Sequence, residues 1–356
     1  MAFLGNCRAT GIGSLPLAGI AESVRAVFTY APDLPYWPQL PKVSRAEGMN
    51  EQAAAGLPGL RISDEGRLRV VQDEAFFAAA ERLMAAWEAG DASVAAMTPE
   101  SAAAFDPFVA EACNRGVKEA KGQVAGPVTV GMAILGEDGN PILYNDVLRD
   151  LLVKFLALRV RWQAERLRGT GAEPIIFVDE PFLASFGTPF FGWGVQQVRE
   201  VLEAVAAGAP TAGSHCCSNT DWTIFLGSRL KIVSFDAFAF AEKFFVYRDA
   251  LAEFLSRGGN IAWGLVPTEP ETLVGLSVPV LQERLLALVA KVEALGFKRD
   301  QVLRQSLITP ACGLGTRNAA TAQRAQELVR DLASSLRREF IIDGTSRPCR
   351  GAVKEV

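Results

Sequence analysis

The chain has 356 residues, 49% hydrophobic and 21% charged, so it can bury a large core and lacks the composition of a disordered segment. Lys and Arg number 36 against 40 Asp and Glu, and the net charge of −4 argues against nucleic acid or an anionic membrane as partner. No run approaches the roughly 20 apolar residues of a membrane-spanning helix, and residues 1–8 lack a signal-peptide pattern, so we expect a cytoplasmic protein.

Short apolar runs alternate with longer helical patterns along the chain, which is typical of a parallel sheet surrounded by helices. The runs predict eight strands, in chain order at residues 9–14, 36–40, 122–130, 175–179, 211–217, 231–236, 260–266 and 306–309. Ala- and Leu-rich segments with apolar positions three and four apart predict crossover helices at residues 74–87, 145–168, 195–207 and 279–295.

Eight strands that alternate with helices predict an α/β fold, a single (β/α)8 TIM barrel that forms one catalytic domain over residues 1–356. The Pro- and Gly-rich residues 32–69 predict an insertion between the first and third strands. A doubly wound fold with two domains is the alternative, but no linker, repeat or composition shift marks a boundary.

The single histidine, His215, lies in a predicted strand beside Cys216 and Cys217. Because side chains alternate along a strand, His215 and Cys217 point to one face and Cys216 to the other. Zinc binds imidazole nitrogen and thiolate sulfur, and a catalytic zinc site uses three protein ligands and keeps one position open. The pair therefore predicts two ligands of a catalytic zinc site.

Cys312 follows the last predicted strand and is the expected third ligand, because the carboxyl ends of barrel strands face one common mouth. On spacing alone, a core histidine with small buried thiols is an equally open interpretation. Cys7, Cys113 and Cys349 have no neighbouring ligand and are expected to be ordinary buried or surface thiols.

Five segments, in order, resemble the catalytic half of cobalamin-independent methionine synthase, whose superfamily includes uroporphyrinogen decarboxylase and the corrinoid-dependent coenzyme M methyltransferases. They are ATGIGSLP at residues 9–16, GPVT at 126–129, VDEP at 178–181, HCC at 215–217 and CGL followed by TR at 312–317. The resemblance implies a zinc-dependent methyltransferase with a TIM-barrel fold, in which His215, Cys217 and Cys312 hold the metal. The family's remaining ligand is a Glu, and Asp236 stands in its place, either as a ligand or as the cap of the next helix.

The resemblance also implies an amino-acid site for homocysteine. The Ile12-Gly13-Ser14 turn would bind the substrate carboxylate through backbone N–H groups and the Ser14 hydroxyl, or it simply ends the first strand. Asp179 would accept the substrate ammonium group. A second acceptor would be Glu47 or Glu51, which alternatively begin a solvated helix.

The methyl donor is inferred from chain length. Full-length members of the family carry an additional N-terminal barrel that helps to bind methylfolate, whereas short core methionine synthases resemble this chain in size. The resemblance therefore implies a loosely bound corrinoid donor, methylcobalamin or a methylated corrinoid protein, and homocysteine as acceptor. The alternatives are coenzyme M or another small thiol as acceptor, a decarboxylase of uroporphyrinogen type, or a zinc-stabilised binding protein.

Overall fold

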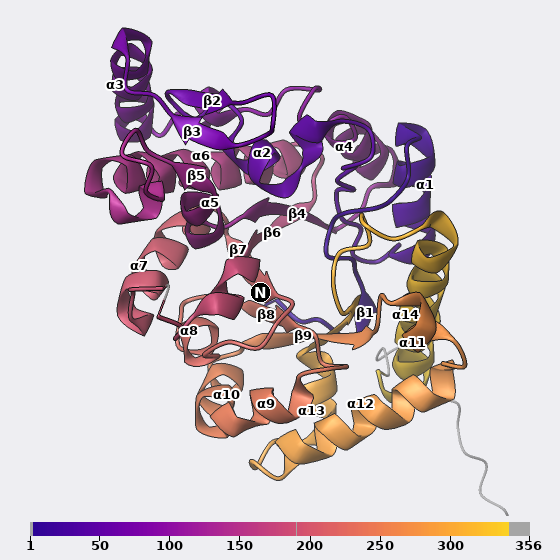
Figure 1. Cartoon of the computed structure of the whole chain (residues 1–356). Coiled ribbons are helices and arrows are strands. Elements are labelled where there is room, and N and C mark those ends of the chain that lie inside the picture. The colour runs from indigo at the N-terminus through magenta and orange to yellow at the C-terminus, as the bar shows by residue number, and fades with distance from the viewer. Residues whose placement is uncertain (1–2, 190, 342–356) are drawn as a thin grey trace, which may run out of the picture.

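Seven parallel strands form the main sheet, in the order β1-β10-β9-β8-β7-β6-β4. The structure is a computed structural model that describes residues 3–189 and 191–341, so Cys349 lies outside the described residues. The sheet curves around a common centre and the helices lie outside it (Figure 1). The strands are β1 (Arg8–Ala9), β4 (Glu119–Ala125), β6 (Glu173–Asp179), β7 (Thr211–Cys216), β8 (Ile232–Phe235), β9 (Asn260–Val266) and β10 (Ser306–Pro310).

The helices that surround the sheet are α1 (Ile20–Tyr30), α2 (Met49–Ala54), α3 (Glu74–Ala89), α4 (Phe105–Arg115), α5 (Pro127–Ala133), α6 (Asp146–Arg168), α7 (Val195–Ala206), α8 (Thr223–Leu226), α9 (Ala241–Phe244), α10 (Arg248–Ser256), α11 (Pro270–Leu273), α12 (Val278–Glu293), α13 (Arg299–Arg304) and α14 (Ala319–Phe340). Side-chain caps lie at the start of two long helices: Asn145 accepts hydrogen bonds from two backbone N–H groups of α6, and Asp73 accepts one from α3. Within the described residues, no helix combines the length and apolarity needed to cross a membrane.

A small second sheet joins β2 (Leu60–Ile62), β3 (Leu68–Val70) and β5 (Ile134–Leu135). β2 runs antiparallel to β3, and β3 pairs in parallel with β5 from much later in the chain. In Figure 1 this sheet lies beside α5 and α6, away from the centre of the main sheet. Strands of two or three residues are too short for an alternating pattern, which is why the sequence did not predict them.

Two apolar layers hold the main sheet. One fills the space inside the curved sheet and consists of Leu34, Ile175, Phe177, Ile232, Ala262 and Leu307. The other lies between the sheet and the helices and includes the alternate residues of the same strands, such as Ile176 and Val178 of β6. Since side chains alternate, the inner face also presents the side chains that form the candidate site.

Most long elements predicted from the sequence are confirmed. The four predicted crossover helices correspond to α3, α6, α7 and α12, with bounds that shift by at most two residues. The last five predicted strands correspond to β6, β7, β8, β9 and β10. Long amphipathic helices and fully buried strands carry the strongest periodic signals.

The predicted strand at residues 122–130 is wrong in its second half. β4 ends at Ala125 and α5 begins at Pro127, whose fixed φ suits the first position of a helix. The buried Glu180 carboxylate accepts hydrogen bonds from the backbone N–H groups of Val128 (2.9 Å) and Thr129 (2.7 Å). The Glu180 carboxylate, which directly follows β6, thus caps the N-terminus of α5. The sequence around residue 127 alone does not reveal this contact.

The first two predicted strands are much shorter than expected. β1 spans two residues, and residues 36–40 form isolated bridges, Ser14 with Gln39 and Tyr36 with Lys121. Pro38 has no N–H to donate to a ladder, and Gly13, at φ +154°, turns the chain after β1. The regular strands therefore form a seven-stranded sheet whose edges, β1 and β4, are linked through these bridges.

A lysine is completely buried inside the sheet. The Lys121 ammonium of β4 donates to the carbonyl of Ile12 (2.7 Å) and to Gln123 Oε1 (2.9 Å), and it lies 4.6 Å from the centre of the Phe177 ring. Burial lowers the pKa of Lys121 to about 8, and the charge of Asp179 opposes this shift. Lys121 thus fixes the carbonyl of the turn that follows β1.

A buried arginine anchors α2 to α6. The Arg159 guanidinium is fully buried and donates to the carbonyls of Ala95, Gln52, Ala53 and Ala55. Three of these carbonyls belong to the C-terminal end of α2, where helix carbonyls have no partner within the helix. Arg159 therefore holds the segment that begins with Glu47 and Met49 against the main sheet.

Arg159→Met is expected to lower the free energy of unfolding by about 3 kcal/mol, because it leaves several buried carbonyls without donors. Arg161→Met is the matched control on the same helix. Its guanidinium pairs with Glu165 at the surface, so its loss is expected to cost less than about 0.5 kcal/mol. Urea unfolding of both variants measures the difference, and equal losses would contradict the anchoring role.

The buried Lys121 also predicts a pH dependence of stability. Its pKa is about 8 in the folded protein and 10.5 in the unfolded chain, so between these values only the unfolded state binds the proton. The unfolding free energy of the wild type, relative to Lys121→Met, is expected to rise by up to about 3 kcal/mol from pH 8 to pH 10.5. Urea titrations at several pH values measure this, and a constant difference would refute it.

Candidate metal centre

Three potential metal ligands lie close together at the carboxyl ends of strands of the main sheet. The ligand atoms of His215, Cys217 and Cys312 all lie within 4.8 Å of one another. His215 is in β7, Cys217 comes directly after that strand, and Cys312 follows β10. The structure thus brings together the two ligands predicted from strand alternation and the third from the far end of the chain.

The histidine is oriented toward this group and has one free nitrogen. His215 is 3% exposed, and its Nδ1 lies 2.9 Å from Ser234 Oγ. Its Nε2 is buried and has no hydrogen-bond partner in the described part of the chain. A buried polar atom without a partner is unfavourable, and a metal ion is a partner that an imidazole nitrogen can take. One nitrogen and two sulfurs form a donor set that suits zinc.

The pKa of Cys217 shifts in the opposite direction from the pKa values of Cys312 and Cys216. A hydrogen bond from the Cys312 thiol, and then the His215 ring, lower the pKa of Cys217 to about 4. The same hydrogen bond to Cys217, and then burial, raise the pKa of Cys312. Cys216 is buried on the other face of the strand, and this burial raises its pKa to about 12. Cys217 is therefore prepared as a thiolate ligand, whereas Cys216 is an inert core thiol.

Asp236 lies directly after β8, but it does not belong to the group of three. Its Oδ1 accepts a hydrogen bond from the backbone N–H of Ala239 (2.8 Å), as expected for a residue that caps the following turn. Burial raises its pKa, and the charge of His215 acts in the opposite direction. Asp236 thus makes the capping contact, and its part in binding metal stays a prediction.

A cavity of about 300 Å³ opens beside the metal group. Its lining includes His215, Cys217 and Cys312 together with four of the residues predicted to bind substrate: Ile12, Ser14, Glu47 and Asp179. Gly13 lies within the turn between two of these residues. Glu51 does not line this cavity and lies 3.9 Å from Arg45. Between the two glutamates that the sequence left open, the structure therefore favours Glu47.

The turn at residues 12–14 has the features of an anion site. The N–H groups of Gly13 and Ser14 donate to no acceptor within the described residues, and Gly13 has φ +154°. The Ser14 hydroxyl accepts a hydrogen bond from the Gly315 N–H (3.1 Å), which leaves its own proton free to donate. Consecutive free N–H groups beside a hydroxyl can bind a carboxylate.

The same turn is tied to the loop that carries Cys312. The Ser14 carbonyl accepts a hydrogen bond from the Leu314 N–H (3.0 Å). A Cβ atom on Gly313 would lie only 2.4 Å from Ser14 Oγ, so this close approach requires glycine. The anion site and the third metal ligand therefore keep a constant separation.

Two buried carboxylates face the cavity. Asp179 Oδ1 accepts a hydrogen bond from the His215 backbone N–H (3.2 Å), and burial raises its pKa while Lys121 and His215 oppose the shift. Glu47 accepts hydrogen bonds from the N–H groups of Leu40 (2.6 Å) and Ala103 (2.7 Å), and burial raises its pKa as well. Each carboxylate keeps lone pairs that can accept a hydrogen bond from a cationic group.

Two buried residues next to the site were missed by the sequence analysis, Ser234 and Lys121. Ser234 is two residues before Asp236, so the alternation of β8 would have placed both on the inner face. Lys121 directly precedes the predicted strand at residues 122–130 and lies in β4, which is buried from Ala120 to Ala125. A lysine in such a strand is a signal of function or of an unusual contact.

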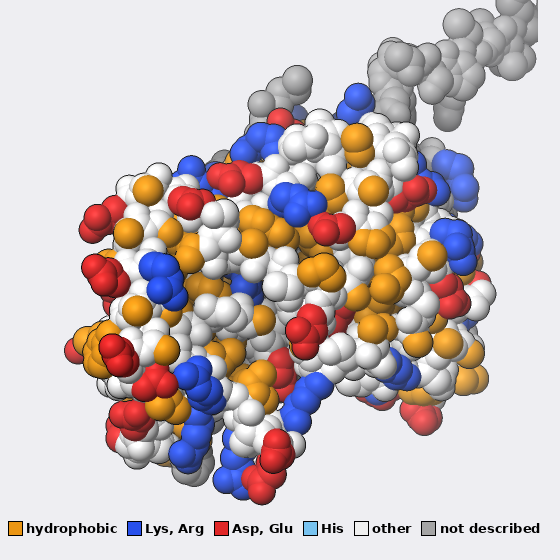
Figure 2. All heavy atoms as spheres, turned by 90° about the horizontal axis from the view of Figure 1, so that it is seen from above, with side chains coloured by type: hydrophobic (Ala, Val, Ile, Leu, Met, Phe, Trp, Pro, Cys, Tyr) orange, Lys and Arg blue, Asp and Glu red, His pale blue; other side chains and the backbone are white. Residues whose placement is uncertain are grey.

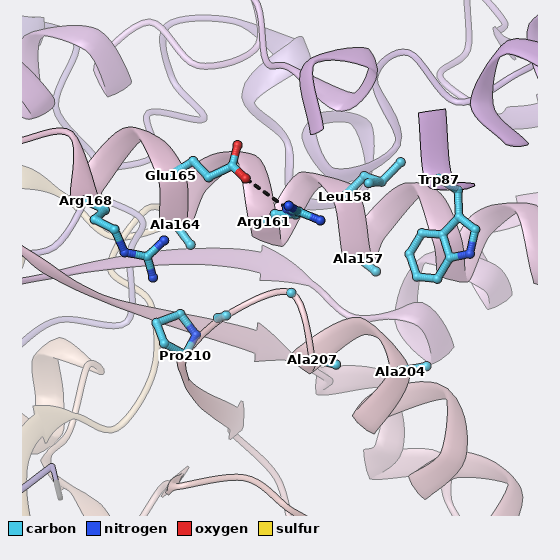
Figure 3. A pocket seen from close by; sticks show the side chains of 12 residues that line it. Trp87, Ala157, Leu158, Arg161, Ala164, Glu165, Arg168, Ala204, Ala207 and Pro210 are labelled. Carbon is cyan, nitrogen blue, oxygen red and sulfur yellow. Dashed lines mark hydrogen bonds and ion pairs between the residues drawn. The ribbon is translucent and has the colours of Figure 1, made fainter. Parts of the chain in front are cut away.

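A second cavity, of about 480 Å³, lies outside the sheet between α6 and the turn after α7 (Figure 3). Small residues and the Arg161–Glu165 ion pair line much of it, and none of the predicted site residues does. On the face seen in Figure 2, Lys and Arg side chains are interspersed with Asp and Glu. That face therefore offers no patch of a single charge.

Comparisons with known proteins identify the family and agree with the fold. A family model described as "Cobalamin-independent synthase, Catalytic domain" matches residues 97–335. A B12-independent methionine synthase from Shewanella sp. W3-18-1, in complex with selenomethionine, is 15% identical and has a TM-score of 0.55, covering 94% of this chain and 99% of that chain. A methyltransferase from Methanosarcina mazei is 14% identical, with a TM-score of 0.49 and coverage of 88% and 84%. No curated protein sequence matches significantly. At these identities the structural matches bear on the fold alone.

The family match corrects one prediction from the sequence. A corrinoid donor, whether methylcobalamin or a methylated corrinoid protein, was inferred from chain length. The matched family is described as cobalamin-independent, which is inconsistent with a corrinoid donor and gives no support to a corrinoid-protein partner. Chain length was a poor guide to the donor, because it contains no information on the residues that would contact it.

Proposed function

Because the chain belongs to the family of cobalamin-independent synthase catalytic domains and is therefore a methyltransferase, we propose that it transfers a methyl group to the thiol of homocysteine, forming methionine. One observation carries this proposal. A single cavity joins a His/Cys/Cys group, which can activate a thiol, to a turn and two carboxylates that can bind an amino acid. The acceptor is then a thiol that is also an amino acid.

His215, Cys217 and Cys312 would hold a zinc ion, and Asp236 is a further candidate ligand from β8. A free thiol with a pKa near 8.5 is only about 3% thiolate at pH 7. Zinc, when bound, would lower the pKa of the substrate thiol and leave one coordination position for its sulfur. Because thiol ligands must stay reduced, we propose that the protein works in the cytoplasm.

The rest of the cavity would orient the amino acid. The N–H groups of Gly13 and Ser14 and the Ser14 hydroxyl would bind the carboxylate, beside the backbone of Ile12. Asp179 and Glu47 would accept hydrogen bonds from the ammonium group, where charge-assisted hydrogen bonds are strongest. Since the turn is tied to the Cys312 loop, these contacts would hold the substrate sulfur beside the metal ligands.

The reaction would be an in-line displacement. The substrate thiol loses its proton, its sulfur forms a bond to the methyl carbon, and the bond from that carbon to the donor breaks with both electrons on the leaving group. The protein's contribution is to position the sulfur and to keep it deprotonated. The donor is then a methyl compound other than a corrinoid.

The cavity is unsuited to a substrate with many carboxylates. Among the described residues that line it, none is Lys or Arg, and its charged side chains outside the metal group are Glu47 and Asp179. Decarboxylation of a tetrapyrrole would need cationic partners for its carboxylates. Coenzyme M, a thiol without an ammonium group, would offer neither acidic residue a cationic partner. These charges favour homocysteine.

We also propose that residues 36–39 complete the sheet as an eighth strand. Their bridges to Ser14 and Lys121 link the two edge strands, with hydrogen bonds from Leu15 N–H to the Gln39 carbonyl (2.9 Å) and from Trp37 N–H to the Lys121 carbonyl (2.9 Å). On this interpretation residues 1–356 form one (β/α)8 catalytic domain, with an insertion before the third barrel strand.

Tag-free protein purified under reducing conditions is expected to contain about one zinc per chain. Cys217→Ala and Cys312→Ala should lose the metal, because each removes a ligand. Cys216→Ala is the matched control, since the neighbouring thiol faces the other side of the strand and should be dispensable. Elemental analysis after dialysis measures the content. Wild-type protein without zinc even after reconstitution would contradict the proposed centre.

The reaction can be tested without knowing the natural donor, with methyl iodide as probe. Zinc-loaded protein is expected to form methionine from homocysteine faster than the free thiol does at pH 7. Asp179→Asn should lower kcat/KM for homocysteine about 10- to 100-fold, because it removes a charge-assisted contact with the ammonium group.

The control substrate for this test is 4-mercaptobutyrate, which lacks the ammonium group. Its kcat/KM should change less than about threefold in Asp179→Asn, since the remaining contacts are unaltered. Liquid chromatography with mass detection measures both products. An equal loss for the two thiols would show that Asp179 does not recognise the ammonium group.

A further inference from the structure

We propose that Ser234 is a positioning residue that holds the ring of His215 so that Nε2 faces the metal ligands. This inference rests on the proposed zinc site. His215 Nδ1 lies 2.9 Å from Ser234 Oγ, and both residues are buried, with Ser234 fully inaccessible to solvent. The contact follows from the strand pairing, because His215 and Ser234 are register partners in the parallel pairing of β7 with β8.

The direction of this hydrogen bond determines what Nε2 can do. A neutral imidazole carries one proton, and its other nitrogen is an acceptor. When Nδ1–H donates to the Ser234 oxygen, Nε2 has a lone pair that points toward the sulfurs of Cys217 and Cys312. When the serine hydroxyl donates to Nδ1 instead, Nε2 carries the proton and cannot bind metal. As an acceptor, Ser234 would stabilise the tautomer whose Nε2 can bind metal.

No other side chain is in a position to take over this role. Asp179 accepts a hydrogen bond from the backbone N–H of His215, and Nδ1 has no further hydrogen-bond partner among the described residues. Ser234 Oγ has no other partner in this part of the chain either. Within residues 3–189 and 191–341, the contact to Ser234 is thus the one hydrogen bond through Nδ1 that restricts rotation of the ring about its Cβ–Cγ bond.

The test compares a substitution that removes the hydroxyl group with one that keeps it. Ser234→Ala removes the acceptor, and partners of metal-ligating histidines are typically worth 10- to 100-fold in metal affinity, so we expect a loss of about this size. Ser234→Thr keeps the hydroxyl and should bind zinc within about threefold of the wild type. Competition with a chromophoric chelator measures the affinity of all three proteins.

A second readout follows from the presence of one histidine in the chain. In tag-free protein labelled with 15N-histidine, a single imidazole gives the nitrogen signals. In the zinc-loaded wild type and in Ser234→Thr, Nδ1 should carry a proton that exchanges slowly with water. In Ser234→Ala this proton should exchange rapidly, because it is no longer hydrogen-bonded.

The outcomes separate positioning from simple packing. A loss of affinity in Ser234→Ala, with unchanged unfolding of the metal-free protein and retention in Ser234→Thr, supports the proposal. Affinity equal to that of the wild type, or an equal loss in both variants together with weakened metal-free stability, would overturn it. Failure of the wild type to bind zinc would instead overturn the proposed function.

Discussion

The parallel register between β7 and β8 is the constraint on which the site depends. It pairs His215 with Ser234 and Cys216 with Phe235, so that the histidine faces inward and its neighbour Cys216 faces the helices. A slip of one residue would exchange the two faces, because side chains alternate with period two. The inner face would then present Cys216 in place of His215 and Cys217. Apolar residues on both sides of the strands make such a slip energetically unfavourable. Core packing therefore also determines which side chains face the candidate site.

The inside of the sheet is divided into layers of different polarity. An apolar layer that contains Phe177 and Leu307 closes one end, the ammonium of Lys121 lies against it, and the carboxylates and thiols occupy the end that opens to the cavity. Charges of both signs are therefore buried close together, and each is satisfied by specific partners. Such groups are unfavourable when unpaired, so their presence points to requirements of binding and not of stability.

The sequence predicted features that depend on one segment or on the general layout of a parallel sheet. It did not predict features that depend on which particular segments pair. Alternation along one strand grouped His215 with Cys217, and the common mouth of parallel strands added Cys312. The junction of β4 and α5 could not be predicted, because the carboxylate that caps the helix belongs to Glu180, which directly follows β6. Ser234 was missed because its importance arises from register with β7, which is a property of the pairing and not of either segment. The short strands near residue 60 depend on a partner at residues 134–135.

The ligands that converge here lie on strands that are not adjacent in the sheet, since β8 and β9 separate β7 from β10. This has a consequence for how the protein matures. A nascent chain that has passed Cys217 holds two of the three ligands and lacks the last until Cys312 has been synthesised and β10 has docked beside β9. Capture of the proposed ion would therefore follow assembly of the sheet, and the folded sheet would be a prerequisite for metallation. Once bound, an ion would join distant parts of the chain and favour the folded state by mass action.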